Sequence, residues 1–407
     1  MATPTFDPTA PCIVLAPHLQ YPARNGSDIS LDRIAKCLSR HVAHVDLIAE
    51  DVVVSFRNGE EHGRLPFANE MRSKSSAGLR ALLRRSHFYL EKFVTPAFSR
   101  RAAELIGSNT YGTILYSYMT TTRATTQIRS EQIPATRLVW THNDEFKWFR
   151  DLAVSTPGPL GRHVARNSEA WLHDFFRSHA DEYLLLHVTE EDRAGYDSLY
   201  PGHRCAQIPI GVDLPPDLNP PVEPERRPVK MIFVGSLGVR MNRDALAHFG
   251  ERFHPLLLKT FGPDLEVHVA GSSPSTEVMA LCNSHGWQLH SNLPDAELEE
   301  LIESATFSLL PFSYATGAKL KLLKSMAHGV PFLATRMVAA QADACVYPSL
   351  MSDEPEEWVQ RIQSVLREGI SSDQRASLRD RAQQHSWEAS AQTIIDALAD
   401  ATLETHS

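Results

Sequence analysis

The sequence predicts an α/β protein of two doubly wound domains, each a parallel sheet with helices on both faces. Short apolar runs alternate along the chain with polar or glycine turns and amphipathic helical patterns, the order typical of parallel sheets. The 407 residues exceed what a single core usually accommodates. Residues 215–228 contain six prolines, which cannot enter a sheet interior and therefore indicate a stiff linker between a domain at 1–214 and a domain at 229–386.

Strands are expected where an apolar run ends at a polar or glycine turn. In the N-terminal half, the first run precedes a helix whose apolar residues, among them Ile34 and Leu38, recur at helical spacing. The predicted strands of this half are 12–16, 42–49, 113–117, 138–141 and 182–188. In the C-terminal half the predicted strands are 231–235, 265–270, 306–311 and 331–334, and the predicted helices are 243–258, 295–304 and about 318–328.

Composition narrows the class of protein. A net charge of −9 disfavours a nucleic-acid partner, and no apolar run is long enough to span a membrane. Five widely separated cysteines without a CxxC pair argue against a disulfide scaffold or a zinc site and favour a reducing compartment. The first residues lack the basic and apolar regions of a secretory signal. We therefore expect a cytoplasmic protein, most simply an enzyme.

The segment 71–101 has a charge balance opposite to that of the whole chain. It carries eight Lys and Arg residues against one acid, Glu91, with apolar side chains interleaved. Such a basic amphipathic segment indicates peripheral contact with an anionic membrane, at the inner membrane face of a cytoplasmic protein. A solvated helix that covers the N-terminal core would show the same pattern, so both interpretations stay open.

The sequence SYATGAKLKLLKSMAHG after the strand at 306–311 predicts an anion site. Its loop ends at Gly317 and opens a helix near Ala318, with Lys319 and Lys321 in the first turn. Free N–H groups and lysines at a helix N-terminus suit a diphosphate. The alternative is an ordinary α/β turn with solvated lysines.

Two further loops follow strands, where ligands bind in doubly wound sheets. Gly235 and Ser236 permit close approach of a ligand to the backbone, and Arg240 can pair with phosphate. Asn242 nearby is equally well explained as a helix cap. The loop at 22–28, with Asn25 and Gly26, has the same design without a lysine and is interpreted as a substrate-facing lid on the acceptor side.

His142 follows the predicted strand 138–141 in the sequence WTHNDEFKWF. A histidine at the carboxyl end of a strand can bind a sugar hydroxyl or move a proton near neutral pH. Asp144 and Glu145 are alternative carboxylates at the same place. With nineteen histidines in the chain, its position rather than its identity distinguishes His142.

Taken together, six segments resemble the family-4 (group 1) glycosyltransferases of GT-B architecture. The segments are PARNGS, WTHNDE, VTEEDRAGY with IPIGVDL, MIFVGSLGVRMNRDAL, NLPDAELEELIESATFSLLPF and ATGAKLKLLKSMAHGVPFLAT. The resemblance implies two Rossmann-like domains facing across a cleft, with a last helix, about 387–407, that returns to the N-terminal domain. It implies transfer of a sugar from a nucleotide-diphosphate sugar with retention of configuration and no obligatory metal or cofactor. The C-terminal domain would hold the donor and the N-terminal domain an unidentified acceptor.

Carried onto this chain, the resemblance implies catalytic roles for His142, Arg240 and Lys319. It implies donor binding by Gly235, Ser236, Leu293, Thr316, Gly317, Ala318, Lys321 and Lys324. Lys324 stands where the family usually has a glutamate that accepts hydrogen bonds from the ribose, and Thr316 where many members have another glutamate. A lysine cannot accept such bonds. The sequence is therefore compatible with an unusual donor or with a catalytically silent scaffold in a polysaccharide or natural-product pathway, and more weakly with a nucleotide-sugar epimerase.

Overall fold

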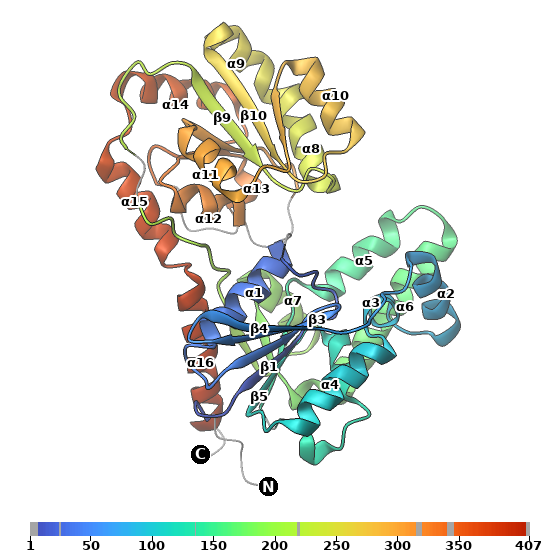
Figure 1. Cartoon of the computed structure of the whole chain (residues 1–407). Coiled ribbons are helices and arrows are strands. Elements are labelled where there is room, and N and C mark those ends of the chain that lie inside the picture. The colour runs from blue at the N-terminus through green and yellow to red at the C-terminus, as the bar shows by residue number, and fades with distance from the viewer. Residues whose placement is uncertain are drawn as a thin grey trace. The chain divides into compact units, whose positions relative to one another are not determined.

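The computed structural model describes residues 7–23, 26–134, 136–217, 220–314, 320–339 and 346–403 (Figure 1). The chain divides into two compact units. Unit 1 comprises Met1–Ile210 and Trp387–Ser407, and unit 2 comprises Gly211–Ser386. Each unit is an α/β structure built on one sheet, which confirms the predicted fold class.

Unit 1 contains an eight-stranded sheet in the order β4-β3-β2-β1-β5-β6-β7-β8. The strands are β1 Cys12–Leu15, β2 Val45–Ile48, β3 Val52–Arg57, β4 Glu60–Pro66, β5 Thr113–Ser117, β6 Thr136–Trp140, β7 Leu184–His187 and β8 Cys205–Gln207. The strands from β2 through β1, β5, β6 and β7 to β8 pair in parallel, whereas β3 pairs antiparallel with both β2 and β4, so one edge of the sheet is antiparallel. This hairpin was not predicted, although Asn58 (φ 51°) and Gly59 (φ 84°) form the Asn-Gly turn that joins such strands.

Helices cover both faces of the unit 1 sheet. They are α1 Gly26–Leu38, α2 Lys74–Arg84, α3 Phe88–Phe93, α4 Pro96–Ser108, α5 Glu145–Ser155, α6 Pro159–His179, α7 Glu190–Leu199 and α16 Trp387–Leu403. The last of these returns to α1, where Glu388 accepts hydrogen bonds from Arg40 (2.6 Å) and contacts His41 (2.8 Å). Figure 1 shows α16 in red beside the blue α1.

Unit 2 contains a six-stranded parallel sheet in the order β11-β10-β9-β12-β13-β14. The strands are β9 Val229–Val234, β10 Leu265–Gly271, β11 Gln288–Ser291, β12 Phe307–Leu310, β13 Phe332–Ala334 and β14 Leu350–Met351. The helices are α8 Arg240–His248, α9 His254–Phe261, α10 Thr276–His285, α11 Asp295–Ser304, α12 Leu320–Ala327, α13 Arg336–Ala339, α14 Pro355–Glu368 and α15 Ser372–Gln383. The single helix predicted at 243–258 is interrupted by a π-helical turn at Phe249–Phe253.

The proline-rich stretch 215–228 belongs to unit 2, and part of it is hydrogen-bonded to the rest of that unit. The Val222 side chain is buried, and its N–H donates to the carbonyl of Ile370 (2.9 Å) while the Ile370 N–H donates back (2.8 Å). The stretch therefore contributes a short β-bridge to unit 2 at this point. No helix in the described part of the chain has the length and apolar character that crossing a bilayer requires.

Candidate functional site

The predicted site residues of unit 2 lie where parallel strands end, the edge at which ligands bind in doubly wound sheets. Gly235 and Ser236 follow β9, and Leu293 follows β11. Lys321 and Lys324 lie on α12, and Arg240 opens α8. Thr316, Gly317, Ala318 and Lys319 lie outside the described residues.

The loop after β9 is held against β10 at a backbone contact that only glycine permits. The N–H of Gly235 donates to the carbonyl of Ala270 (3.0 Å). A Cβ on Gly271 would lie 1.6 Å from the carbonyl oxygen of Gly235. Any residue other than glycine at position 271 would therefore clash with the backbone of Gly235. Backbone atoms cannot move aside as the end of a flexible side chain can.

Asn242 fixes the same loop from the side. Its amide nitrogen donates to the carbonyl of Ser236 (2.8 Å), and the residue is only 3% exposed. The cap alternative considered for Asn242 is wrong, because the N-cap of α8 is Val239 and Asn242 bonds the loop instead. A Cβ on Gly235 would lie 2.9 Å from both the Asn242 amide nitrogen and the Lys321 Cε. The loop and the first turn of α12 are therefore in contact, as a shared anion site requires.

Lys321 is the partly buried cation of this contact. Its Nζ lies 5.4 Å from the centre of the Phe312 ring. Burial lowers the pKa of Lys321 to about 8. An ammonium so poorly solvated gains more from an anionic ligand than an exposed lysine does.

Arg240 is exposed and already has a carboxylate partner. Its Nε lies 3.3 Å from Asp244, which also accepts a hydrogen bond from Tyr314 (2.7 Å). Burial raises the pKa of Asp244, but the bonds from Tyr314 and Arg243 outweigh it, and the pKa is lowered. Asp244 thus holds Tyr314, which directly precedes the undescribed residues 315–319, against α8. Sequence reasoning missed this pair because 70 residues separate its members.

In unit 1, His142 lies at the end of β6 with a positive φ of 55°. Its Nε2 lies 2.8 Å from the hydroxyl oxygen of Ser117, the last residue of β5. The Tyr118 ring, also at positive φ (67°), is centred 4.4 Å from the imidazole. Non-glycine residues in this region of φ are strained and concentrate at functional sites.

A second histidine, missed by sequence reasoning, joins this cluster from β1. The His18 ring is centred 5.9 Å from His142 and 5.0 Å from Tyr118. Burial lowers the pKa of His18 to about 4. Burial, assisted by His18, places the pKa of His142 well below its usual range. Both imidazoles are therefore neutral at pH 7, so each offers one donor and one acceptor nitrogen.

The two carboxylates considered beside His142 have separate roles. Asp144 is the N-cap of α5 and accepts a hydrogen bond from the Lys147 N–H (2.9 Å). Glu145 is 1% exposed, and burial raises its pKa well above the usual range. Gly26 opens α1, whereas Asn25 lies outside the described residues. The interpretation of their loop as a lid stays a prediction.

One group of side chains in the described ranges has the composition of a metal site. The ligand atoms of His187, His203 and Cys205 lie within 4.8 Å of one another. His187 Nε2 lies 2.9 Å from His203 Nε2, a distance that a hydrogen bond between the two imidazoles explains. We assign no metal to it.

Comparison with known proteins relates this geometry to a family. Residues 228–368 match the family described as "Glycosyl transferases group 1". No curated protein matches the chain.

Solved structures match it over nearly its whole length. A structure of WaaG, "a glycosyltransferase involved in lipopolysaccharide biosynthesis", is 14% identical, covers 94% of this chain and 98% of its own, and has a TM-score of 0.60. Anabaena Alr3699/HepE "in complex with UDP and glucose" is 12% identical, with coverage of 96% and 100% and a TM-score of 0.57. An E. coli trehalose-6-phosphate structure "bound with UDP-2-fluoro glucose" is 12% identical, with coverage of 96% and 99% and a TM-score of 0.58. At these identities the likeness establishes the shared two-domain fold.

Proposed function

We propose that this chain, which belongs to the group 1 glycosyltransferases through its domain at residues 228–368, transfers a sugar with retention of anomeric configuration. The donor is a nucleotide-diphosphate sugar, and the acceptor is a glycan, a lipid-linked sugar or a small molecule. Two of the similar structures contain UDP or a UDP-sugar. The more specific assignment to family 4 rests on the sequence resemblance.

The observation that carries the proposal is the contact between the glycine loop after β9 and Lys321 on α12. Departure of a nucleoside diphosphate leaves negative charge on phosphate oxygens beside an electron-poor sugar carbon. Fixed N–H groups and cations stabilise such charge without a metal. Lys321 lies beside Gly235, and Arg240 and Lys319 are proposed to add charge where the leaving group forms.

His142 is proposed to contact the transferred sugar. Because its imidazole is neutral, it can exchange hydrogen bonds with hydroxyl groups without adding a positive charge beside an oxocarbenium-like carbon. The strained backbone at His142 and Tyr118 fixes the direction of the ring. We therefore expect His142 to orient the sugar rather than to donate a proton to the leaving group.

Donor binding is tested with the full chain and a panel of UDP-, GDP- and dTDP-sugars. A donor that binds only the folded protein raises Tm. Lys321→Ala should remove most of that rise, whereas Lys259→Ala, at an exposed position on α9, should keep it. Release of nucleoside diphosphate and formation of product then test transfer. A panel without any Tm rise, hydrolysis or transfer contradicts the proposal.

Lys324 supports the alternative, a silent glycosyltransferase-like scaffold. Lys324 is half-buried on α12, and the pKa of His328 is lowered to about 4 by burial and then by the charge of Lys324. No carboxylate therefore stands at this position to receive the ribose. Under the scaffold function, Lys321→Ala would leave cellular function intact. Under the enzymatic function, it would abolish it.

A peripheral contact with an anionic membrane through residues 71–101 is proposed as part of this function, at the inner face of the cytoplasmic membrane. On α2, Ala77 and Ala81 face the protein, while Leu79 (59% exposed) and Leu83 (77%) point outward. Arg84 lies beside Leu83 and is itself 59% exposed. Two exposed leucines beside guanidinium groups suit an anionic bilayer surface. The leucines can enter the acyl-chain region while the guanidinium groups contact the anionic headgroups.

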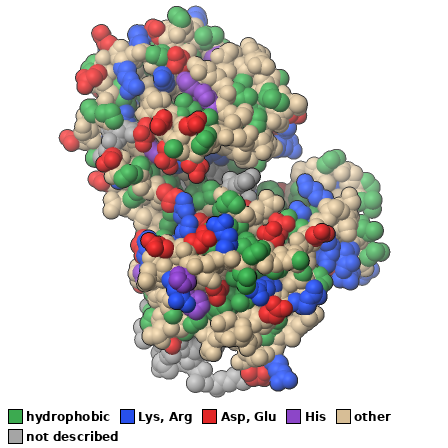
Figure 2. Space-filling model, in the orientation of Figure 1, with side chains coloured by type: hydrophobic (Ala, Val, Ile, Leu, Met, Phe, Trp, Pro, Cys, Tyr) green, Lys and Arg blue, Asp and Glu red, His purple; other side chains and the backbone are tan. Residues whose placement is uncertain are grey.

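The exposed apolar surface extends to the neighbouring turn between α5 and α6. Val154 is 80% exposed and Leu160 is 69% exposed. The Asn167 amide of α6 donates to the Ala81 carbonyl of α2 (3.5 Å), and Leu160 lies seven residues, or about 10 Å, from Asn167 along α6. Figure 2 shows hydrophobic and basic side chains together over α2, α5 and α6. We name this surface the apolar-basic face of unit 1.

A further inference from the structure

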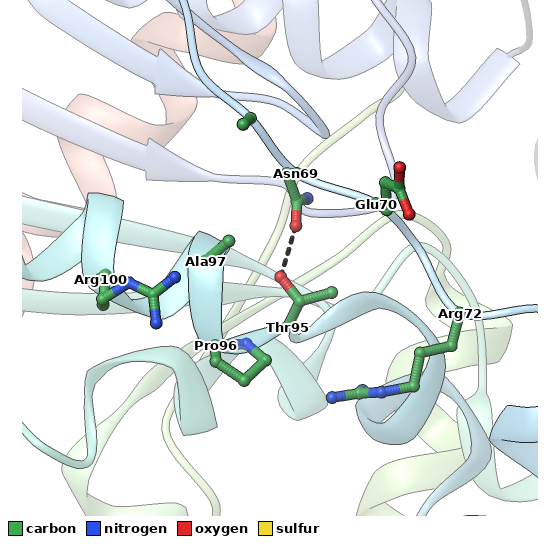
Figure 3. Close-up of a pocket in the computed structure, with 8 residues that line it drawn as sticks. Asn69, Glu70, Arg72, Thr95, Pro96, Ala97 and Arg100 are labelled. Atoms are coloured by element: carbon green, nitrogen blue, oxygen red, sulfur yellow. Dashed lines mark hydrogen bonds between the residues drawn. The ribbon is translucent and has the colours of Figure 1, made fainter.

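An open cavity lies in unit 1, between the segment after β4 and the start of α4. It has a volume of about 440 Å³ and is lined by residues of the segment after β4 and of the N-cap and first two turns of α4. Its lining residues are Ala68, Asn69, Glu70, Arg72, Thr95, Pro96, Ala97 and Arg100 (Figure 3). The donor site and the sugar contact proposed above do not use this cavity, although five of its lining residues belong to the basic segment 71–101.

The cavity opens at the carboxyl edge of the unit 1 sheet. The helix α4 precedes β5, so its first turn lies at the end where parallel strands finish. The segment after β4 reaches the same edge, because Pro66 pairs with Val52 just past the end of β2. This is the edge at which doubly wound sheets bind their ligands.

The cavity is also a neighbour of the histidine cluster. The Phe93 ring is centred 6.1 Å from His18, and Phe93 precedes Thr95, a lining residue of the cavity, by two positions. His18 in turn contacts His142, the group proposed to bind the transferred sugar. A molecule seated in the cavity therefore lies on the same edge as that group and within the same unit.

Hydrogen bonds hold two of the lining residues, Asn69 and Thr95, in place. The Thr95 hydroxyl donates to Asn69 Oδ1 (2.5 Å) and accepts from the Phe98 N–H (3.1 Å). The Asn69 amide nitrogen donates to the Glu50 carbonyl (2.5 Å). Because these bonds fix Asn69 and Thr95, this pair defines the shape of the cavity. We expect the other lining side chains to bind the ligand.

The charged side chains of the lining are two arginines, Arg72 and Arg100, and one carboxylate, Glu70. In Figure 3 the guanidinium groups of Arg72 and Arg100 lie on either side of Thr95, while the carboxylate of Glu70 points away from it. One N–H of the Arg72 guanidinium donates to the Glu91 carbonyl. This bond anchors the side chain and leaves its other N–H groups available as donors. Two guanidinium groups about a preformed hollow match the oxygen atoms of a phosphate, which arginine recognises in a bidentate manner.

We propose that this cavity binds a phosphate group carried by the acceptor, with Arg72 and Arg100 as its ligands. The inference deepens the proposed glycosyl transfer by naming the class of acceptor. It rests on the proposed function only in treating the bound phosphate compound as the acceptor. Arg72 directly precedes Ser73, the N-cap of α2, so the cavity adjoins the apolar-basic face. The phosphate has two sources, a membrane lipid headgroup or a soluble phosphorylated acceptor.

The first experiment is calorimetric titration of the full chain with inorganic phosphate at low salt. Arg100→Gln and Arg72→Gln should each weaken binding about tenfold or more, the loss expected when a charged hydrogen-bonding partner is removed. Arg129→Gln, an exposed arginine outside the cavity, should leave it unchanged. Arg100 is exposed on α4, so its variant keeps the test valid if Arg72→Gln destabilises the protein.

Phosphate that binds the donor site is separated by a third variant. Binding that Arg100→Gln removes and Lys321→Ala retains belongs to the cavity, whereas the opposite pattern, or equal binding by all variants, overturns the proposal. Donor-induced Tm rises should persist in Arg100→Gln. If the wild-type protein binds donor but no phosphate in the cavity, the cavity proposal fails while the proposed glycosyl transfer stands. The two failures are therefore distinguishable.

The source of the phosphate is identified with two probes. Glycerol 3-phosphate should compete with inorganic phosphate if the cavity accepts a phosphate monoester. Competition between glycerol 3-phosphate and vesicles of phosphatidylglycerol in phosphatidylcholine assigns the cavity to a lipid headgroup. Cavity binding without vesicle competition assigns it to a soluble phosphorylated acceptor. Vesicle binding that is unchanged in Arg100→Gln, without phosphate binding, contradicts the cavity and leaves only the membrane contact.

Discussion

A Cβ atom on Gly271 would lie 1.6 Å from the carbonyl oxygen of Gly235, so the ends of β10 and β9 meet at backbone distance. Gly271→Ala should therefore displace the loop that adjoins Lys321. We expect destabilisation of about 1–3 kcal/mol, typical of overpacking in a well-packed region, together with loss of donor-induced Tm rise. Urea unfolding and the donor panel measure the two effects. The control is Gly107→Ala in α4, where an added Cβ would have nothing within 4 Å. This substitution should stabilise the protein slightly, because alanine favours the helix over glycine.

The hydrogen bond from Tyr314 to Asp244 should matter for donor binding more than for stability. Tyr314→Phe removes a 2.7 Å bond that ties Tyr314, on the carboxyl side of β12, to Asp244 of α8. We expect a several-fold increase in the KM for the donor and a change in stability of about 1 kcal/mol or less, since the residue is exposed. Tyr347→Phe is the matched control, because Tyr347 is similarly exposed (39% against 44%) and also donates to a carboxylate at 2.7 Å. Equal effects of both variants on KM would argue against a role for the loop.

Buried histidines should make unit 1 acid-sensitive. His87 is fully buried, burial lowers its pKa to about 3, and its Nδ1 accepts a hydrogen bond from the Tyr89 N–H (3.0 Å). The folded pKa lies below the unfolded value near 6.5, so this contribution is complete above pH 6.5 and is lost as pH falls toward 3. At pH 5 the loss is about 2 kcal/mol for this one group.

Urea unfolding at pH 7 and pH 5 measures that loss. His87→Gln should reduce the pH dependence, even though it lowers stability at pH 7. His163→Gln, at an exposed position on α6, should keep the full dependence. A wild-type protein equally stable at both pH values would show that the folded histidine takes up its proton as readily as the unfolded one.

The apolar-basic face should be separable from folding by substitution. Leu79→Ser with Leu83→Ser removes two exposed apolar side chains, each worth about 1–2 kcal/mol if buried in a bilayer. We expect binding to phosphatidylglycerol-containing vesicles to weaken about tenfold or more, with Tm nearly unchanged. Leu258→Ser with Met337→Ser, exposed in unit 2, should have no effect on vesicle binding. Sedimentation with vesicles measures it, and raised salt should weaken the wild type through its arginines.

The sequence alone determined the alternation of strands and helices and the places where loops follow strands. Hydrophobic periodicity is a local property, so β1, β5, β6, β9, β10 and β12 are all found within their predicted ranges or one or two residues from them. It also identified Gly235, Lys321 and His142 as neighbours of a sheet edge, since a residue after a strand must lie there. The β3–β4 hairpin escaped notice because β4 is exposed along its whole length and lacks the apolar residues by which strands were predicted.

Only the tertiary structure decided which of these loops meet. His18 reaches His142 because β1, β5 and β6 are adjacent in the sheet, an order that no local pattern contains. In the same way Asn69 meets Thr95 across 26 residues, and both line the cavity of unit 1. Strand order and helix packing arise from burial of the whole core, which sums over residues distant in the chain. The chemistry of each loop is therefore written locally, whereas the combination of loops into a binding site is a property of the fold.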